Sequence, residues 1–214
     1  MSAAAPSPDL ARLPDDFWAV VGINAERRAD VETFRGMLTR ANANTNLVGA
    51  STLSEFEVRH FIDSAQLAWF APDARIWADL GSGAGLPGVI LAILMKGRPG
   101  GHVHLVESMA KRCRFLSEVI EALRLPATLH HARAEALSLT ADVVTARACA
   151  PLPRLLSFAR PYLVRGAKGL FLKGQEVESE IDEARKIWRF SWRTHISLSD
   201  PRGRVLELER LTHV

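Results

Sequence analysis

A glycine-rich segment constrains the fold of this chain more than any other feature of its sequence. Residues 79–88 read Asp-Leu-Gly-Ser-Gly-Ala-Gly-Leu-Pro-Gly. They begin at the end of the apolar run 76–80 and precede the apolar run 89–95. Glycines adopt positive φ and let a ligand approach the backbone, and a helix that starts at such a loop offers N–H groups to that ligand. We therefore expect a strand, a ligand-binding turn and a helix in succession.

Short apolar runs alternate with helical patterns after residue 75. These runs are 76–80, 103–106, 127–130, 143–146 and 170–172. Such alternation is typical of βαβ units in a parallel sheet. Two further alternating runs, 192–198 and 204–211, are joined by the turn-forming residues 199–203, which predicts an antiparallel hairpin. The sequence thus predicts an α/β fold with a seven-stranded, mostly parallel sheet.

The first 74 residues have a helical pattern. Phe34, Met37 and Leu38 recur at helical spacing, and Thr52-Leu53-Ser54-Glu55 resembles a capping box that opens a helix reaching Phe70. In that helix Asp63 is expected either to act as a cap or to hold Arg59 one turn away. We expect residues 1–74 to form a helical extension of a Rossmann-like core, residues 75–214, within one compact unit.

Composition restricts the classes of function. The chain has 27 Lys and Arg against 24 Asp and Glu, a mildly basic balance that suits a polyanionic partner without identifying one. Cys113 and Cys149 form no C-x-x-C pair, so we expect no metal site and no disulfide. Residues 1–8 lack the pattern of a signal peptide, and no apolar run reaches membrane-spanning length. We expect a cytoplasmic protein without a membrane partner.

The glycine segment fits two cofactors. Glycines at 81, 83 and 85 after Asp79 match a pattern that binds S-adenosylmethionine, whereas glycines at 83, 85 and 88 match the dinucleotide fingerprint of NAD-dependent oxidoreductases. The helical segment before the loop favours the methyl donor. So does Tyr162, the only tyrosine, because Gly166 stands where a short-chain dehydrogenase has lysine. Glu107 ends the second apolar run, where a carboxylate accepts ribose hydroxyl hydrogens in either case.

Further motifs follow one another between residues 46 and 174. They are Asn46-Leu47-Val48, Arg59-His60-Phe61-Ile62-Asp63-Ser64, the glycine segment, Lys111-Arg112-x-x-Phe115-Leu116 and Arg147-Ala148-Cys149-Ala150-Pro151-Leu152. Together these motifs resemble the RsmG (GidB) family. Ser64-Ala65 and Thr145-Ala146 depart from the usual family pattern, but neither departure removes a charged group.

The resemblance implies a class I methyltransferase fold and transfer of a methyl group from S-adenosylmethionine to N7 of a guanine in 16S rRNA, with S-adenosylhomocysteine as product. The 30S subunit or its precursor is the implied partner, and no obligate protein partner is evident. Motif positions and strand ends together predict cofactor contacts from Asp79, Gly81, Gly83, Gly85, Leu86, Glu107, Ala134, Glu135 and Arg147. Predicted RNA contacts come from Arg59, His60, Lys111, Arg112, Arg147 and Lys173.

This chemistry needs alignment more than proton transfer. Guanine N7 carries an exposed lone pair, so we expect no general base and no certain catalytic residue. Cys149 leaves open a nucleophilic mechanism like that of cytosine-C5 methyltransferases, although the usual Pro-Cys order is missing. The sequence is also compatible with methylation of another RNA, with an NAD-dependent oxidoreductase and with a non-catalytic RNA-binding protein.

Overall fold

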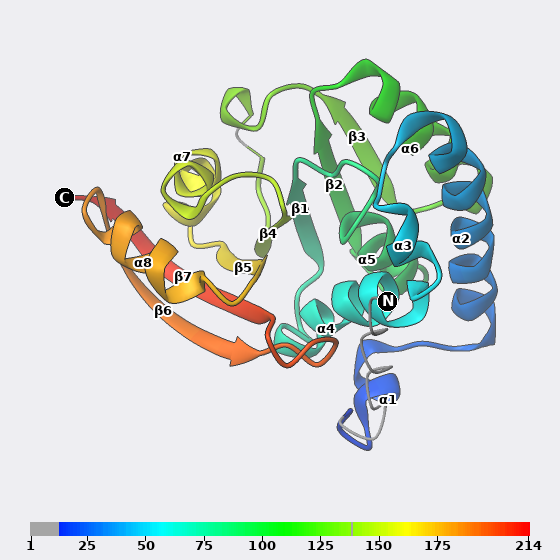
Figure 1. Ribbon diagram of the computed structural model, residues 1–214, viewed down its shortest axis with the longest axis horizontal. Coiled ribbons are helices and arrows are strands. Elements are labelled where there is room, and N and C mark those ends of the chain that lie inside the picture. Colours follow the sequence, from blue (N-terminus) through cyan, green and yellow to red (C-terminus); the bar gives the residue numbers. More distant parts are fainter. Residues whose placement is uncertain (1–12, 138) are drawn as a thin grey trace, which may run out of the picture.

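The structure is a computed structural model, and it describes residues 13–137 and 139–214. The first part of the expected helical extension, residues 1–12, therefore lies outside the described residues. The strands are β1 (Ile76–Leu80), β2 (His102–Glu107), β3 (Ala127–His131), β4 (Val143–Arg147), β5 (Lys168–Lys173), β6 (Trp188–Ile196) and β7 (Arg204–His213). They form one sheet in the order β3-β2-β1-β4-β5-β7-β6 (Figure 1).

The sheet confirms the predicted architecture. β1 to β5 pair in parallel, and β7 runs antiparallel to both β5 and β6. The predicted start of the hairpin was wrong, because β6 begins at Trp188 and ends at Ile196 instead of covering 192–198. Trp188 pairs with His213 beyond an irregularity in the ladder, and it is buried against the core.

Two layers of helices cover the sheet. The helical segments are α1 (Phe17–Val21), α2 (Ala25–Thr45), α3 (Ala50–Leu53), the π-helix η2 (Glu57–Ile62), α4 (Asp63–Phe70), α5 (Gly88–Met95), α6 (Ala110–Leu123), the 3-10 helix η3 (Ala134–Ala136), α7 (Leu152–Leu163) and α8 (Val177–Arg185). Alternate residues of a strand serve opposite faces. Trp77 of β1 packs with α2, α4, α5 and α6, and Ala78 packs with α7 and α8 (Figure 1). None of the described helices is long and apolar enough to cross a membrane.

The predicted capping box at residues 52–55 is not formed. The backbone remains right-handed helical at Ser54 and at Phe56, so no helix start with unpaired N–H groups arises there. Thr52 instead donates its hydroxyl hydrogen to the carbonyl oxygen of Gly49, at 2.7 Å. The helix continues through the π-helix η2 into α4, and π-helical turns are frequent at functional sites.

The helices before the sheet share its apolar core. Phe34 of α2 is fully buried, and its ring lies 6.2 Å from that of Phe56 and 6.5 Å from that of Phe115 on α6. These rings belong to one apolar cluster with Trp77 of the central strand. We therefore propose that the helical extension and the sheet unfold as one unit.

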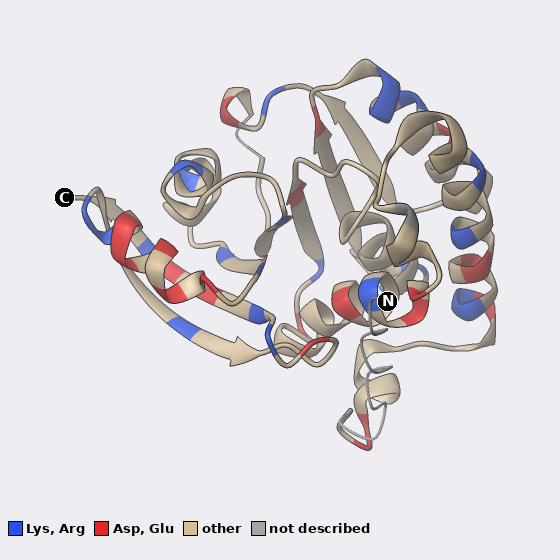
Figure 2. Ribbon diagram, in the orientation of Figure 1, with Lys and Arg blue, Asp and Glu red and all other residues tan. Residues whose placement is uncertain are grey.

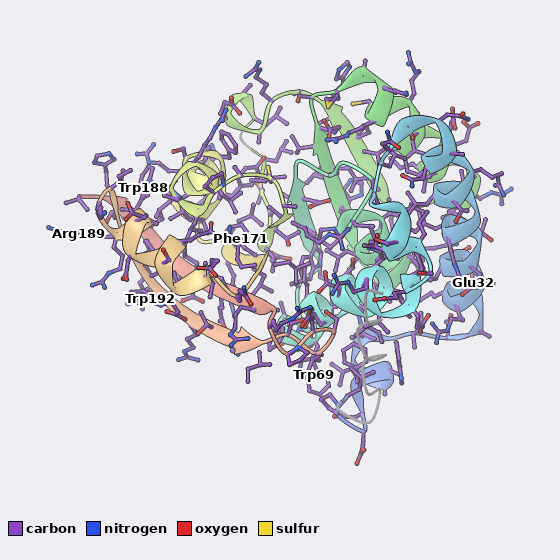
Figure 3. All side chains as sticks on the ribbon, in the orientation of Figure 1. Glu32, Trp69, Phe171, Trp188, Arg189 and Trp192 are labelled. Atoms are coloured by element: carbon purple, nitrogen blue, oxygen red, sulfur yellow. The ribbon has the colours of Figure 1, made fainter. Side chains whose placement is uncertain are left out.

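Replacing Phe34 tests this proposal. Phe34→Ala should lower the free energy of unfolding by about 3–5 kcal/mol, because it leaves a cavity between α2 and α6. Denaturant unfolding followed by tryptophan fluorescence and by circular dichroism should show one coincident transition. Glu32→Ala, on the outward side of the same helix, is the control and should change stability by less than about 0.5 kcal/mol (Figure 3). Two separated transitions would contradict a single unit.

Candidate functional site

The glycine loop connects β1 to α5 through backbone that side chains would obstruct. Gly81 has φ 70°, and a Cβ atom there would lie 2.7 Å from the Sγ of Cys149. At Gly88 a Cβ atom would come within 2.3 Å of Leu105 and 2.5 Å of the Asp79 carboxylate. The loop is thus packed tightly against the end of β4 on one side and against β1 and β2 on the other.

Asp79 fastens the two ends of this loop. Its Oδ2 accepts the N–H of Gly88 at 3.1 Å, and its carbonyl oxygen accepts the hydroxyl hydrogen of Ser82 at 3.0 Å. Oδ1 is buried and has no hydrogen-bond partner among the residues that the structure describes. Burial raises the pKa of this carboxyl to about 7. One oxygen of Asp79 therefore keeps unused acceptor capacity inside the fold, behind the loop.

Glu107 fixes the same loop from the neighbouring strand. Its Oε2 accepts the N–H of Gly83 at 2.9 Å, and its Oε1 accepts those of Ser108 and Met109, both at 2.8 Å. The residue is only 4% exposed. A carboxylate offers about four lone-pair sites, so these bonds leave room for one further donor. The sequence analysis expected Glu107 to accept two ribose hydroxyl hydrogens, and this would require one of its three hydrogen bonds from backbone N–H groups to break. Both acidic strand ends are red in Figure 2.

The remaining residues of the predicted cofactor set lie around the loop in different ways. Gly83 and Gly85 have φ 56° and 86°, whereas the Leu86 side chain is buried in the apolar core with α5. Ala134 is nearly buried in η3, after β3, and Glu135 beside it forms an exposed pair with Arg133 at 3.9 Å. Leu86 can therefore offer a ligand its backbone but not its side chain.

Arg147, at the end of β4, connects the sheet to the helices before it. Its Nη1 donates to the carbonyl oxygen of Arg59 at 3.0 Å and lies 3.3 Å from His60 Nδ1 and 3.4 Å from Asp63 Oδ2. The expected pair of Asp63 with Arg59 was therefore wrong. Arg59 instead bonds Asp200 at 3.0 Å. The Asp63 carboxyl is half-buried, so its charge requires a close partner, and Arg147 supplies it.

His60 is held in one tautomer by this arrangement. Burial, followed by the charge of Arg147, lowers the pKa of His60 to about 4, so the ring is neutral at physiological pH. Nδ1 faces the donor Arg147, which places the proton on Nε2, 3.0 Å from the Thr52 hydroxyl oxygen. His60 thus acts in the structure as a fixed connector between Arg147 and α3.

A cleft of 1180 Å³ opens beside this network. Its walls come from residues 47–49 and 52, η2 and the start of α4 on one side. The end of β4 with residues 148–151, the end of β5 with residues 174 and 175, Glu180 of α8 and the turn between β6 and β7 complete them. Four predicted RNA contacts line it, namely Arg59, His60, Arg147 and Lys173. Cys149 lines it as well and also touches Gly81, so the cleft adjoins the glycine loop.

The other predicted RNA contacts lie outside the cleft lining. Lys111 Nζ donates to the carbonyl oxygen of Asn44 at 3.0 Å, and Arg112 Nη1 lies 3.8 Å from Glu107 Oε2. Lys173, although in the cleft, is 9% exposed and pairs with Glu180 at 2.6 Å. Its charge is therefore largely offset within the protein.

Sequence reasoning missed the contribution of the turn between β6 and β7. Ser197, Ser199, Asp200 and Arg202 all line the cleft. The sequence analysis placed Ser197 in a strand and marked residues 199–203 only as a connection. Asp63 Oδ1 accepts the hydroxyl hydrogen of Ser199 at 2.7 Å. No local pattern signals this contact, because the two residues are 136 positions apart.

Two candidate chemical groups are poorly suited to reaction. Burial, together with the nearby Asp79 and Glu107 carboxylates, raises the pKa of the Cys149 thiol, which disfavours the thiolate that a nucleophile requires. Tyr162 is 1% exposed, and burial raises its pKa to about 12. Neither environment supports a covalent mechanism or the tyrosine of a dehydrogenase.

Comparison with known proteins identifies relatives over nearly the whole chain. Residues 27–203 match the model of the family described as "GidB: rRNA small subunit methyltransferase G". "Ribosomal RNA small subunit methyltransferase G" of Caulobacter vibrioides (strain NA1000 / CB15N) is 54% identical over 213 residues, which cover 97% of this chain and 99% of that protein. The protein of the same name from Methylorubrum populi is 44% identical, covering 90% of this chain and 92% of the relative.

Solved structures resemble the fold at low sequence identity. A putative O-methyltransferase from Klebsiella pneumoniae is 12% identical with a TM-score of 0.57, covering 85% of this chain and 90% of that one. A mutant of MtNAS in complex with S-adenosylmethionine is 14% identical with a TM-score of 0.55, covering 95% of this chain and 86% of that one. These likenesses support the class of fold.

The raised pKa of Asp79 predicts a pH-dependent effect of Asp79→Asn. The folded-state pKa lies above the unfolded value, so the native state binds an extra proton up to about pH 7 and must hold an ionised buried carboxylate above it. The stability of the wild type relative to the variant should therefore fall from pH 5 to pH 8, by about 2–3 kcal/mol. Denaturant unfolding at both pH values measures the difference. A constant difference would contradict the raised pKa.

Proposed function

The chain belongs to the rRNA small subunit methyltransferase G (GidB) family, and on that premise we propose that it methylates N7 of a guanine in 16S rRNA. S-adenosylmethionine is the proposed donor and S-adenosylhomocysteine the other product. The proposed substrate is the 30S subunit or its precursor, in the cytoplasm. One observation carries the proposal within the structure: the glycine loop and the cationic cleft meet at Cys149, so a donor on the loop would lie next to RNA in the cleft.

The residues around the loop fit S-adenosylmethionine. Glu107 retains acceptor capacity for a ribose hydroxyl, and the unpartnered Oδ1 of Asp79 suits a donor such as an ammonium group. We propose that Gly81, Gly83, Gly85 and the backbone of Leu86 line the donor, with Ala134 and Glu135 beside the adenine. When bound, this group supplies a methyl on a cationic sulfur.

The protein residues have mainly to bind and orient. Guanine N7 attacks through its own lone pair, so alignment of the base with the methyl group carries the catalysis. Arg147 is the group best placed for that task, because it ends β4 where loop and cleft meet and because three contacts fix its guanidinium. His60, neutral and bonded through both ring nitrogens, supports Arg147 and removes no proton.

The proposal predicts the product. Purified protein, S-adenosylmethionine and 30S particles from cells that lack the enzyme should yield 7-methylguanosine in the 16S rRNA, detected by nucleoside mass spectrometry. 5-Methylcytidine would favour the Cys149 mechanism, and any other methylated nucleoside would disprove the N7 assignment. Absence of methylation despite donor binding would point to another RNA.

Glu107→Gln tests the site of the donor. Loss of the charged acceptor at Glu107 should weaken binding of S-adenosylhomocysteine about 10-fold or more, measured by titration calorimetry. Glu118→Gln, an exposed change on α6, is the matched control and should bind with wild-type affinity. Equal affinity of the two variants would remove Glu107 from the site, and thermal unfolding of both checks that they fold.

A further inference from the structure

The turn between β6 and β7 carries a carboxylate that two arginines share. Asp200 Oδ2 accepts from Arg59 Nη1 at 3.0 Å and from Arg202 Nη2 at 3.1 Å. Its Oδ1 accepts from Arg202 Nε at 3.2 Å and from the Arg202 backbone N–H at 2.9 Å. These bonds hold the pKa of Asp200 below its usual value, with those from Arg202 the main cause. All three side chains line the cleft.

The charge balance at this end of the cleft differs from that around Arg147 and Lys173. Arg147 lies against Asp63, and Lys173 against Glu180, so each of these cations has a carboxylate of its own. Asp200 and Glu55 balance Arg59 and Arg202. Arg204, which also lines the cleft, bonds the backbone carbonyl oxygens of Pro201 and Gly203, so this part of the rim keeps an excess of one positive charge. In the turn itself, acidic and basic positions stand side by side (Figure 2).

Hydrogen bonds hold the turn rigidly against the helices. Gln66 of α4 donates to Ser197 Oγ at 3.0 Å and accepts the backbone N–H of Leu198 at 2.8 Å. Ser199 donates to Asp63 at 2.7 Å. These contacts are mostly buried, so Asp200 is fixed relative to η2, from which Arg59 reaches it. The shared carboxylate therefore sets the separation of two guanidinium groups that come from distant parts of the chain.

We propose that Arg59 and Arg202, positioned by Asp200, form a binding subsite for a backbone phosphate of the RNA that enters the cleft. A guanidinium has five N–H donors, and Asp200 takes two side-chain donors from Arg202, so donors remain for a second oxyanion. Arg202 is 66% exposed, so its free side reaches a ligand without rearrangement of the core. Two guanidinium forks suit a phosphodiester, whose oxygens accept bidentate bonds.

Asp200 is a positioning residue in this proposal. It does not bind RNA, and its negative charge alone would repel a phosphate. Asp200→Asn raises the local charge by one, so a cleft that acted only through net charge would bind RNA more tightly in the variant. A subsite that depends on arginine geometry would bind RNA more weakly. The variant keeps one acceptor oxygen and replaces the other by an NH2 group, so the bonds that now use both oxygens of Asp200 cannot all form.

This subsite rests on the proposed function, since it requires an RNA substrate. Its test measures binding of RNA and is separate from the test that identifies the methylated product. Affinity of the full-length protein for 30S particles is measured at several salt concentrations in the presence of S-adenosylhomocysteine. Arg202→Ala should weaken binding about 10-fold and lower the slope of log affinity against log salt by about 1. Asp200→Asn should also weaken binding, and Arg202→Lys should restore only part of the loss. In turnover assays the effect of these variants should appear mainly in KM.

Arg189→Ala is the matched control. Arg189 is an exposed arginine at the start of β6, at the opposite end of the hairpin from the turn (Figure 3), and its loss should leave affinity and salt slope unchanged. Wild-type affinity in Arg202→Ala, tighter binding by Asp200→Asn, or equal losses in Arg202→Ala and Arg189→Ala would each overturn the subsite. If the wild type binds 30S particles but forms another methylated nucleoside, the proposed product is disproved. The salt dependence of binding by the variants still tests the phosphate subsite in that case.

Discussion

The bonds of the half-buried Asp63 carboxylate are the interactions on which the arrangement of the cleft depends. It lies between Arg147 of β4 and Ser199 of the last turn, while its own backbone is part of α4. Burial raises the pKa of Asp63, and the two partners oppose that shift. An ionised group in this position is tolerated only with close partners, so three distant segments are held together at one point. The cleft has its walls where these segments meet.

Two further carboxyl groups fix the glycine loop. Asp79 and Glu107 end adjacent parallel strands, and each bonds a backbone N–H of the same loop. The loop therefore has a defined shape before a ligand binds. This preorganisation suits the proposed methyl transfer to a base nitrogen, because that reaction requires accurate placement of donor and acceptor and little else.

The cations of the cleft differ in how far the protein covers them. Arg147 and Lys173 have their own carboxylates and are mostly covered, so they stiffen the ends of β4 and β5. Arg59 and Arg202 share one carboxylate at the rim and are more exposed. Because a paired and covered cation gains little from a further anion and an exposed one keeps its donors, the rim is where we propose that an RNA phosphate binds.

The sequence by itself determined the sheet, its closing hairpin and the glycine loop with the acidic strand ends at Asp79 and Glu107. These features depend on alternation of apolar residues and on glycine conformations, which are local properties of the chain. The resemblance carried by the motifs around Arg59 and Arg147 added the family. Only the tertiary structure decided the partners of the charged groups: Asp63 bonds Arg147, 84 positions away, and Arg59 bonds Asp200, 141 positions away. Local spacing favoured a pair between Asp63 and Arg59, but the hydrogen bonds around α4 and the last turn place each of them against a different segment. A long-range ion pair forms only where folding brings its two segments together, and spacing along the chain does not show where that happens.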